Sequence, residues 1–285
     1  MLIDQLLNQS INKLDDAGVP TARLDTLILL EDVVGKDRAW LLAHPEHELT
    51  SQQVSKLASL VARRSKHEPL AYIRGKSEFY GREFLVTPAT LQPRAETETM
   101  IDLLKQVQGK GQRAKGKAIV DVGAGSGCLA ITAKLEFPEA EVYATEINKD
   151  ALKVAKQNAK KLYADVNFLQ GNLLESFLST FDFRLSTQFT ILANLPYVPN
   201  NHTINQAAMQ EPKVAIFGGE DGLDLYREMF EQIDKGSGFR AQGSVKPKYI
   251  LAESLPFQHE ELANIAKQYG YKLVKTEDFI QLFEF

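Results

Sequence analysis

The feature that most constrains the fold is a glycine-rich segment, DVGAGSG at 121–127, which lies between a strand pattern and a helix pattern. The apolar run at 118–122 predicts a buried strand, and the apolar residues from Cys128 to Phe137 predict a helix. Glycines suit a loop that a ligand approaches closely, because a Cβ atom would collide there. The spacing Gly-x-Gly-x-Gly differs from the Gly-x-Gly-x-x-Gly of nicotinamide- and flavin-binding folds, which argues against a dehydrogenase. This segment therefore predicts an α/β domain with a small-molecule site at the end of its first strand.

The rest of the C-terminal part continues to alternate between strands and helices. We expect helices at 150–162, 223–233 and 258–269, and further strands at 141–146, 166–170, 189–193, 249–252, 271–276 and 280–285. The connection between the last two strands is too short for a parallel crossover, so these strands must pair antiparallel. The sequence predicts an α/β, Rossmann-like fold with a mostly parallel, seven-stranded sheet.

The first 75 residues show helical periodicity and no strand pattern. Helices are expected at about 3–14 and 22–34, and again from Thr50, where Thr50 and Gln53 have the spacing of a capping box. Short extended pieces then surround a glycine and a proline between Phe79 and Leu91. We therefore divide the chain into a helical substrate-recognition domain at 1–75, a linker or β-hairpin at 76–95, and a catalytic domain at 96–285.

Composition argues against several classes of function. A net charge of −4 gives no global basic field for holding nucleic acid. The single cysteine, Cys128, rules out an intramolecular disulfide, and the five histidines show no metal-ligand spacing, so we expect no metal. The chain shows neither a signal peptide nor a run of about 18 apolar residues, so we expect a cytoplasmic protein without membrane contact. The basic segment 105–117 predicts a solvated loop, with a contact to RNA or an acidic partner as the alternative.

Two further polar side chains follow strands of the predicted sheet. Glu146 ends the second strand, where a carboxylate can accept two hydrogen bonds from a ribose diol. Asn172 follows the third strand and could bond the edge of an adenine through its amide. Together with the glycine loop they form a pocket for a nucleoside joined to an amino acid, which fits S-adenosyl-L-methionine. The expected cofactor-binding residues are Asp121, Gly123, Ala124, Gly125, Gly127, Glu146, Asn172 and Asn194.

The fourth strand is followed by Asn194-Leu195-Pro196-Tyr197, at the edge of the sheet that bears ligands in such folds. An asparagine oxygen and a backbone carbonyl of Leu195 or Pro196 can each accept one N–H of a planar –NH₂ group. These contacts orient the nitrogen and support positive charge that develops on it. The tyrosine offers a face for packing against a planar group. We expect Asn194, Pro196 and Tyr197 to be catalytic, and all four residues to bind the substrate.

The motif resembles the Asn-Pro-Pro-Tyr family of amino-methyltransferases, and the glycine loop with its acid resembles class I methyltransferases. Four other segments look like the PrmC/HemK family: EPLAYIRG at 68–75, EFYGREF at 78–84, LQPRAETE at 91–98 and EPKVAIFGGEDGL at 211–223. The resemblance covers essentially the whole chain. It implies a class I fold and methyl transfer to the side-chain amide nitrogen of the glutamine in the Gly-Gly-Gln motif of peptide chain release factors. It also implies that Arg94 and Glu98 lie at the rim of the site, although they could equally form an exposed ion pair.

The sequence departs from the family pattern at three positions. Leu195 replaces the usual proline, Glu146 replaces an aspartate, and Asn172 stands where an acid is common. Leucine lacks the rigid φ of proline, so we expect a looser loop or a reshaped slot. Because Asn-Leu-Pro-Tyr is also typical of rRNA adenine dimethyltransferases, an adenine-N6 methyltransferase acting on RNA or DNA is the alternative. A non-catalytic cofactor-binding protein is a third hypothesis. We expect a monomer.

Overall fold

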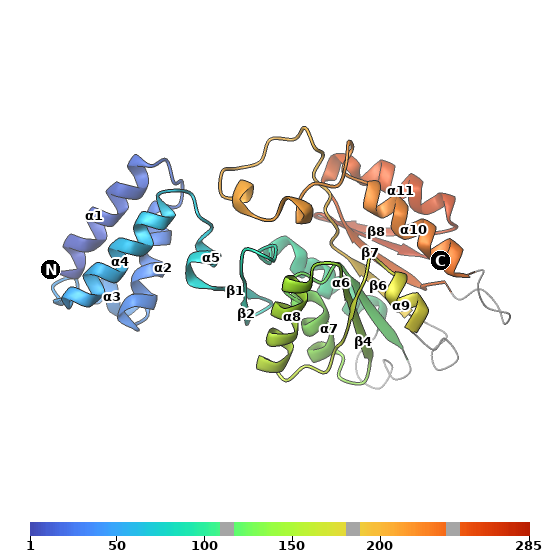
Figure 1. Ribbon diagram of the computed structural model, residues 1–285, viewed down its shortest axis with the longest axis horizontal. Coiled ribbons are helices and arrows are strands. Elements are labelled where there is room, and N and C mark those ends of the chain that lie inside the picture. Colours follow the sequence, from blue (N-terminus) through green and yellow to red (C-terminus); the bar gives the residue numbers. More distant parts are fainter. Residues whose placement is uncertain (109–116, 181–188, 238–245) are drawn as a thin grey trace. The chain divides into compact units, whose positions relative to one another are not determined.

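The computed structural model describes residues 1–108, 117–180, 189–237 and 246–285 (Figure 1). Contacts between Cα atoms divide the chain into two compact units. The helical unit comprises Met1–Gly75 with Ile204–Gln210, and the sheet unit comprises Lys76–Thr203 with Glu211–Phe285. Of the basic segment 105–117, residues 105–108 are the last residues of a helix rather than part of a loop, and residues 109–116 lie outside the described residues.

The helical unit contains α1 (Ile3–Asp16), α2 (Ala22–Val34), α3 (Arg38–Ala43), α4 (Ser51–Arg64) and the short α5 (Leu70–Arg74). The capping box predicted at the start of α4 is present, with the Thr50 side chain accepting from the backbone N–H of Gln53. The guanidinium of Arg64 donates to Asp25 at 2.6 Å, and both side chains are buried. A buried charge needs such a partner, so this ion pair holds α4 against α2 in one arrangement.

The sheet unit is built on a seven-stranded sheet with the order β5-β4-β3-β6-β7-β9-β8. The strands from β5 to β7 are parallel, and β9 pairs antiparallel with both β7 and β8. The predicted seven-stranded, mostly parallel sheet with a C-terminal antiparallel hairpin is therefore confirmed. The strands are β3 (Ala118–Val122), β4 (Glu141–Glu146), β5 (Asn167–Gln170), β6 (Phe189–Ala193), β7 (Tyr249–Glu253), β8 (Lys272–Glu277) and β9 (Ile280–Glu284).

Helices cover both faces of this sheet (Figure 1). Alternate residues of a strand point to opposite faces, so Val120 of β3 packs in one core and Ile119 in the other. The core that contains Ile119 includes side chains of α6 (Glu98–Gln108), α7 (Cys128–Glu136) and α8 (Lys149–Lys161). The core that contains Val120 includes side chains of α9 (Glu175–Thr180), α10 (Asp224–Ser237) and α11 (His259–Gln268). Burial on both faces explains why the central strands are rich in apolar residues.

A two-stranded hairpin precedes α6, formed by β1 (Lys76–Phe79) and β2 (Arg82–Leu85). Its turn places Tyr80 and Gly81 at φ values of 52° and 68°, as a tight hairpin turn requires. Asn158 of α8 accepts from the N–H of Leu85 and donates to the carbonyls of Leu85 and Ser126. One buried amide therefore ties this hairpin to the glycine-rich loop. In the described part of the chain, no helix is long and apolar enough to cross a membrane.

Candidate active site

A cavity of about 370 Å³ lies where β3, β4, β5 and β6 reach their carboxyl ends. This position is the usual ligand site of an open parallel sheet, and the volume falls in the range of about 300–1,000 Å³ that is common for small-molecule sites. Segments far apart in the sequence form its wall: 89–94, the loop after β3, the ends of β4 and β5, the motif at 194–196, and 212–215. Of the predicted site residues, the lining includes Asp121, Gly123, Ala124, Gly125, Glu146, Asn172, Asn194, Leu195 and Pro196.

The glycine loop is held against the neighbouring strand by backbone hydrogen bonds. The N–H groups of Gly123 and Ala124 both donate to the carbonyl of Thr145, at 3.0 and 2.9 Å. Gly125 has a φ of 54° with open space on its side-chain side, so the loop exposes bare backbone. Gly127 is not part of the lining. A Cβ atom on Gly127 would lie 3.1 Å from the side chain of Ala155, so packing of α7 on α8 accounts for this glycine, and a cofactor contact there stays a prediction.

Glu146 ends β4 inside the cavity and is almost fully buried. One carboxylate oxygen accepts the N–H of Gly125 at 2.8 Å, and the other accepts the N–H of Asn148 at 2.8 Å. These two bonds fix the carboxylate, and each oxygen keeps a lone pair for a further donor. The arrangement suits the two adjacent hydroxyls of a ribose.

Asp121 and Asn172 lie on either side of this position. The Asp121 carboxylate accepts the N–H of Ala130 at 3.0 Å, near the start of α7. Burial raises the pKa of Asp121 to about 7, with the charge of Glu146 adding to the effect. The amide nitrogen of Asn172 donates to Glu228 of α10 at 2.5 Å, and this bond leaves the amide oxygen as an acceptor.

The motif that follows β6 is fixed by side chains from other parts of the sheet unit. Asn194 donates from Nδ2 to the hydroxyl of Thr97 at 3.0 Å. The N–H of Leu195 donates to the hydroxyl of Tyr226 at 3.3 Å. The Leu195 side chain is only 2% exposed and packs beneath Gly123. The leucine side chain therefore fills the core under the glycine loop, while Leu195 also contributes to the lining of the cavity, and a looser loop or a reshaped slot stays a prediction.

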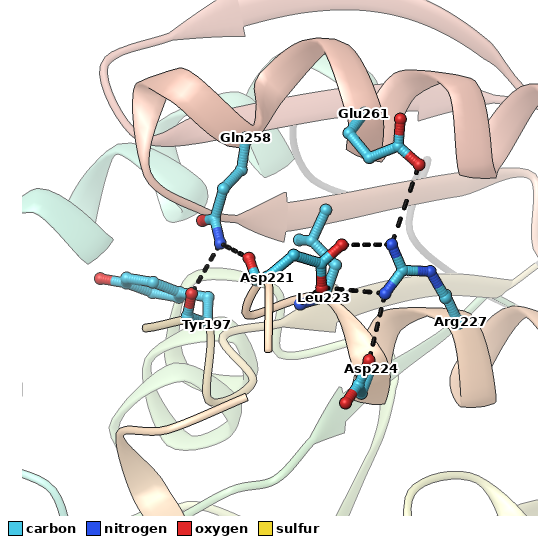
Figure 2. Close-up of polar contacts among 7 residues, drawn as sticks. All are labelled: Tyr197, Asp221, Leu223, Asp224, Arg227, Gln258 and Glu261. Atoms are coloured by element: carbon cyan, nitrogen blue, oxygen red, sulfur yellow. Dashed lines mark hydrogen bonds and ion pairs between the residues drawn. The ribbon is translucent and has the colours of Figure 1, made fainter. Parts of the chain in front are cut away.

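The loop at 217–223 is clamped onto the motif (Figure 2). Gln258, at the start of α11, donates from Nε2 to the carbonyls of Tyr197 at 2.8 Å and Asp221 at 2.6 Å. Its own oxygen accepts the N–H of Leu255 at 2.9 Å, so the orientation of this buried amide is determined. Figure 2 also shows Arg227 joining Asp221 to the side chains of two acids on the surface, Asp224 and Glu261.

Two glycines allow this close approach. A Cβ atom on Gly218 would overlap the carbonyl oxygen of Pro196, and one on Gly222 would overlap that of Tyr197. Both carbonyls are therefore covered by the loop. Within the described residues, the carbonyl of Leu195 accepts no hydrogen bond. Of the two backbone acceptors considered from the sequence, the geometry favours Leu195.

Tyr197 does not line the cavity, and its hydroxyl donates to Glu253 at 3.0 Å. Glu253 ends β7 and is 1% exposed. Burial raises the pKa of Glu253 to about 7, although polar side chains close to it, including the Tyr197 hydroxyl, oppose the shift. Glu253 was not predicted from the sequence, yet it ends an apolar strand, as Glu146 does, and the same strand-end criterion could have found it.

The two residues expected at the rim take separate roles. Arg94 lines the cavity and pairs with Glu211, a carboxylate that also accepts the N–H of Gln92 at 3.0 Å. Glu98 lies outside the lining and accepts the N–H of Tyr80 at 2.7 Å. Glu211 thus ties the segment before α6 to the loop that follows the motif. No cluster of three metal-ligating side chains occurs among the residues that the structure describes.

Family models match both parts of the chain: the PrmC N-terminal domain at residues 5–75 and a methyltransferase domain at residues 113–279. A release factor glutamine methyltransferase of Koribacter versatilis is 37% identical over 236 residues, which cover 82% of this chain and 81% of that protein. The corresponding protein of Geobacter sulfurreducens is 36% identical and covers 79% of this chain and 76% of its own length.

A bifunctional methyltransferase of Rickettsia conorii is 30% identical over 95% of this chain, but the chain spans only 54% of that protein. Among solved structures, the catalytic domain of hMettl16 aligns with a TM-score of 0.50 at 11% identity, covering 79% of this chain and 90% of that one, which is a likeness of fold alone. The matches to the two release factor methyltransferases extend over most of both proteins. The chain therefore belongs to the family of release factor glutamine methyltransferases.

Proposed function

We propose that this protein transfers a methyl group from S-adenosyl-L-methionine to the side-chain amide nitrogen of the glutamine in the Gly-Gly-Gln motif of a peptide chain release factor. The names of its relatives support the substrate, and the cavity at the edge of the sheet supports the chemistry. We further propose that it acts in the cytoplasm, as a monomer.

The residues present fit this cofactor. Glu146 offers two fixed carboxylate oxygens to a ribose diol, and Gly125 beside it leaves room for a ligand against the backbone. The oxygen of Asn172 is available to an exocyclic amine of adenine. When bound, the cofactor supplies a methyl group that its sulfonium already activates.

The observation that carries the proposed reaction is the orientation of Asn194. Its Nδ2 is engaged by Thr97, so its Oδ1 remains to accept an N–H of the substrate. The Leu195 carbonyl, which accepts no hydrogen bond within the described residues, supplies the acceptor for the second N–H, and two such bonds hold a planar –NH₂ group in one orientation. Positioned acceptors also stabilise the positive charge that develops on the nitrogen as its lone pair forms the new bond to carbon. The proton can leave afterwards, so no general base has to act before the transfer.

Methylation of adenine in RNA or DNA was the alternative, supported by the leucine at position 195 and by the basic segment 105–117. The Leu195 side chain packs beneath Gly123 and is only 2% exposed, so the core accounts for most of it. The relatives that match over most of their length are release factor glutamine methyltransferases, and we therefore prefer glutamine as the substrate.

The test is to incubate the protein and labelled cofactor with one substrate at a time. The substrates are a release factor, a release factor whose Gly-Gly-Gln glutamine is replaced by alanine, ribosomal RNA and DNA. We expect label only in the unaltered release factor. Label that persists in the alanine variant, or that appears in nucleic acid instead, would overturn the proposal.

A further inference from the structure

We propose that Glu228 of α10 is a positioning residue that makes the cofactor site select a 6-amino purine, because it fixes which end of the Asn172 amide is left for the ligand. This inference rests on the proposed function and deepens it. Asn172 lines the cavity, whereas Glu228 lies outside the lining. The choice of nucleobase is thus assigned to a carboxylate that acts through another residue.

An asparagine amide carries an acceptor at one end and a donor at the other, so the same side chain can recognise two kinds of base. With its oxygen toward the ligand, the amide accepts a hydrogen bond from the 6-amino group of adenine. With its nitrogen toward the ligand, it donates to the 6-oxo group of guanine or hypoxanthine. An asparagine at position 172 therefore leaves the base undecided until the orientation of its amide is known.

The carboxylate of Glu228 determines that orientation. Nδ2 of Asn172 donates to Oε1 of Glu228 at 2.5 Å. A carboxylate has no hydrogen to donate, so the end of the amide that faces it has to be the nitrogen. Within the described residues, Glu228 is the only hydrogen-bond partner of the Asn172 side chain. The amide oxygen is therefore the end that remains for a ligand in the cavity.

A second side chain of α10 supports the same arrangement. Gln232 lies one turn after Glu228, and its Oε1 accepts the backbone N–H of Leu174 at 2.8 Å. This bond leaves Nε2 of Gln232 to donate to the same oxygen of Glu228 at 3.3 Å. Leu173, between the two anchored residues of the loop, has a φ of 46°, which is unfavourable for a residue with a Cβ atom. The two side chains of α10 therefore hold the loop after β5 in a conformation that its sequence does not favour by itself.

The test measures the Kd of S-adenosyl-L-homocysteine and of S-inosyl-L-homocysteine by calorimetry. The two ligands differ only at the edge of the purine that carries the 6-amino or the 6-oxo group, so the ratio of their Kd values reports the choice of base. We expect the wild-type protein to bind the inosyl ligand about 10–100-fold more weakly, because its 6-oxo group meets the Asn172 oxygen and two acceptors stay unpaired.

Glu228→Met keeps the length of the side chain and removes both acceptors, so the Asn172 amide can turn either end toward the ligand. We expect this variant to bind the two ligands about equally. Glu231→Met is the matched control, because it removes an exposed carboxylate from the same helix, and it should keep the wild-type ratio. Adding Asn172→Asp to Glu228→Met supplies acceptors that need no orienting partner and should restore the preference for the adenosyl ligand. A loss of packing around α10 would not be repaired in this way.

Equal binding of the two ligands by the wild type, a wild-type ratio in Glu228→Met, or a double variant that does not regain the preference would overturn the inference. If Glu228→Met does not fold, Glu228→Gln decides the question. A glutamine can meet either end of the Asn172 amide, so this variant should also lower the ratio, and an unchanged ratio would overturn the inference. A wild-type protein that binds neither ligand would instead refute the cofactor site of the proposed function, so the two failures are distinguishable.

Discussion

Replacing Gly222 by alanine tests whether the loop at 217–223 holds the substrate motif in place. The new Cβ atom would overlap the carbonyl oxygen of Tyr197 and the amide nitrogen of Gln258. Neither atom can move away easily. The carbonyl oxygen of Tyr197 belongs to the backbone, and the amide nitrogen of Gln258 is hydrogen-bonded to two carbonyls.

The size of the effect follows from the geometry. A real Cβ atom essentially never comes within 3.0 Å of such an atom, so the loop and the motif must separate by about 1 Å. A displacement of about 1 Å at a reacting group costs about 10²-fold in rate. The φ of 82° at Gly222 adds a strain of about 1–2 kcal/mol for any residue with a Cβ atom. We therefore expect kcat for a release factor to fall about 10²-fold, while the cofactor still binds at its separate strand ends.

The matched control is Gly81→Ala, where φ is 68° and nothing lies within 4 Å of the added Cβ. This variant carries similar backbone strain without the collision, so its kcat should stay close to that of the wild type. Steady-state kinetics and cofactor titration on both variants complete the assay. A Gly222→Ala variant as active as Gly81→Ala would show that the loop at 217–223 does not position the motif.

Three other substitutions probe separate parts of the site. Asn194→Ala removes the acceptor for the substrate amide and should lower kcat about 10²–10³-fold with cofactor affinity nearly intact, and unchanged turnover would refute its role. Glu146→Ala removes both fixed acceptors for the ribose and should raise the KM for S-adenosyl-L-methionine, with a wild-type KM as the contradicting result. Gln258→Leu removes the donor that pairs with the carbonyls of Tyr197 and Asp221, and because both hydrogen bonds are only partly buried it should lower the free energy of unfolding by about 1 kcal/mol per bond. Denaturant titration measures this loss, and an unshifted midpoint would contradict the role of Gln258 in holding the loop at 217–223 against the motif.

The sheet could be predicted from the sequence to within a few residues because each central strand is a continuous apolar run bounded by polar residues. Pieces of a single turn, such as α5 at Leu70–Arg74, could not, because they lack enough residues to show a period. The short α9, Glu175–Thr180, was missed for the same reason.

Some residues of the candidate site could likewise be predicted from the sequence, and others could not. Glu146 and Asn194 were found because each follows a strand, and parallel strands end at one edge of a sheet. Thr97 and Gln258 were missed because their partners in the motif are 97 and 61 residues away, and no local pattern reports such a pairing. The role of Leu195 also depends on a distant neighbour, the Gly123 above it.

The central claim is that a glutamine side-chain nitrogen receives the methyl group. Fragmentation mass spectrometry of a release factor treated with the enzyme and S-adenosyl-L-methionine locates the modified atom most directly. We expect a single added methyl group on the side-chain amide nitrogen of the Gly-Gly-Gln glutamine, in strongly reduced yield when Asn194→Ala replaces the wild-type enzyme. A methyl group on any other residue of the release factor, or an unmodified release factor in the presence of folded, cofactor-bound enzyme, would contradict it.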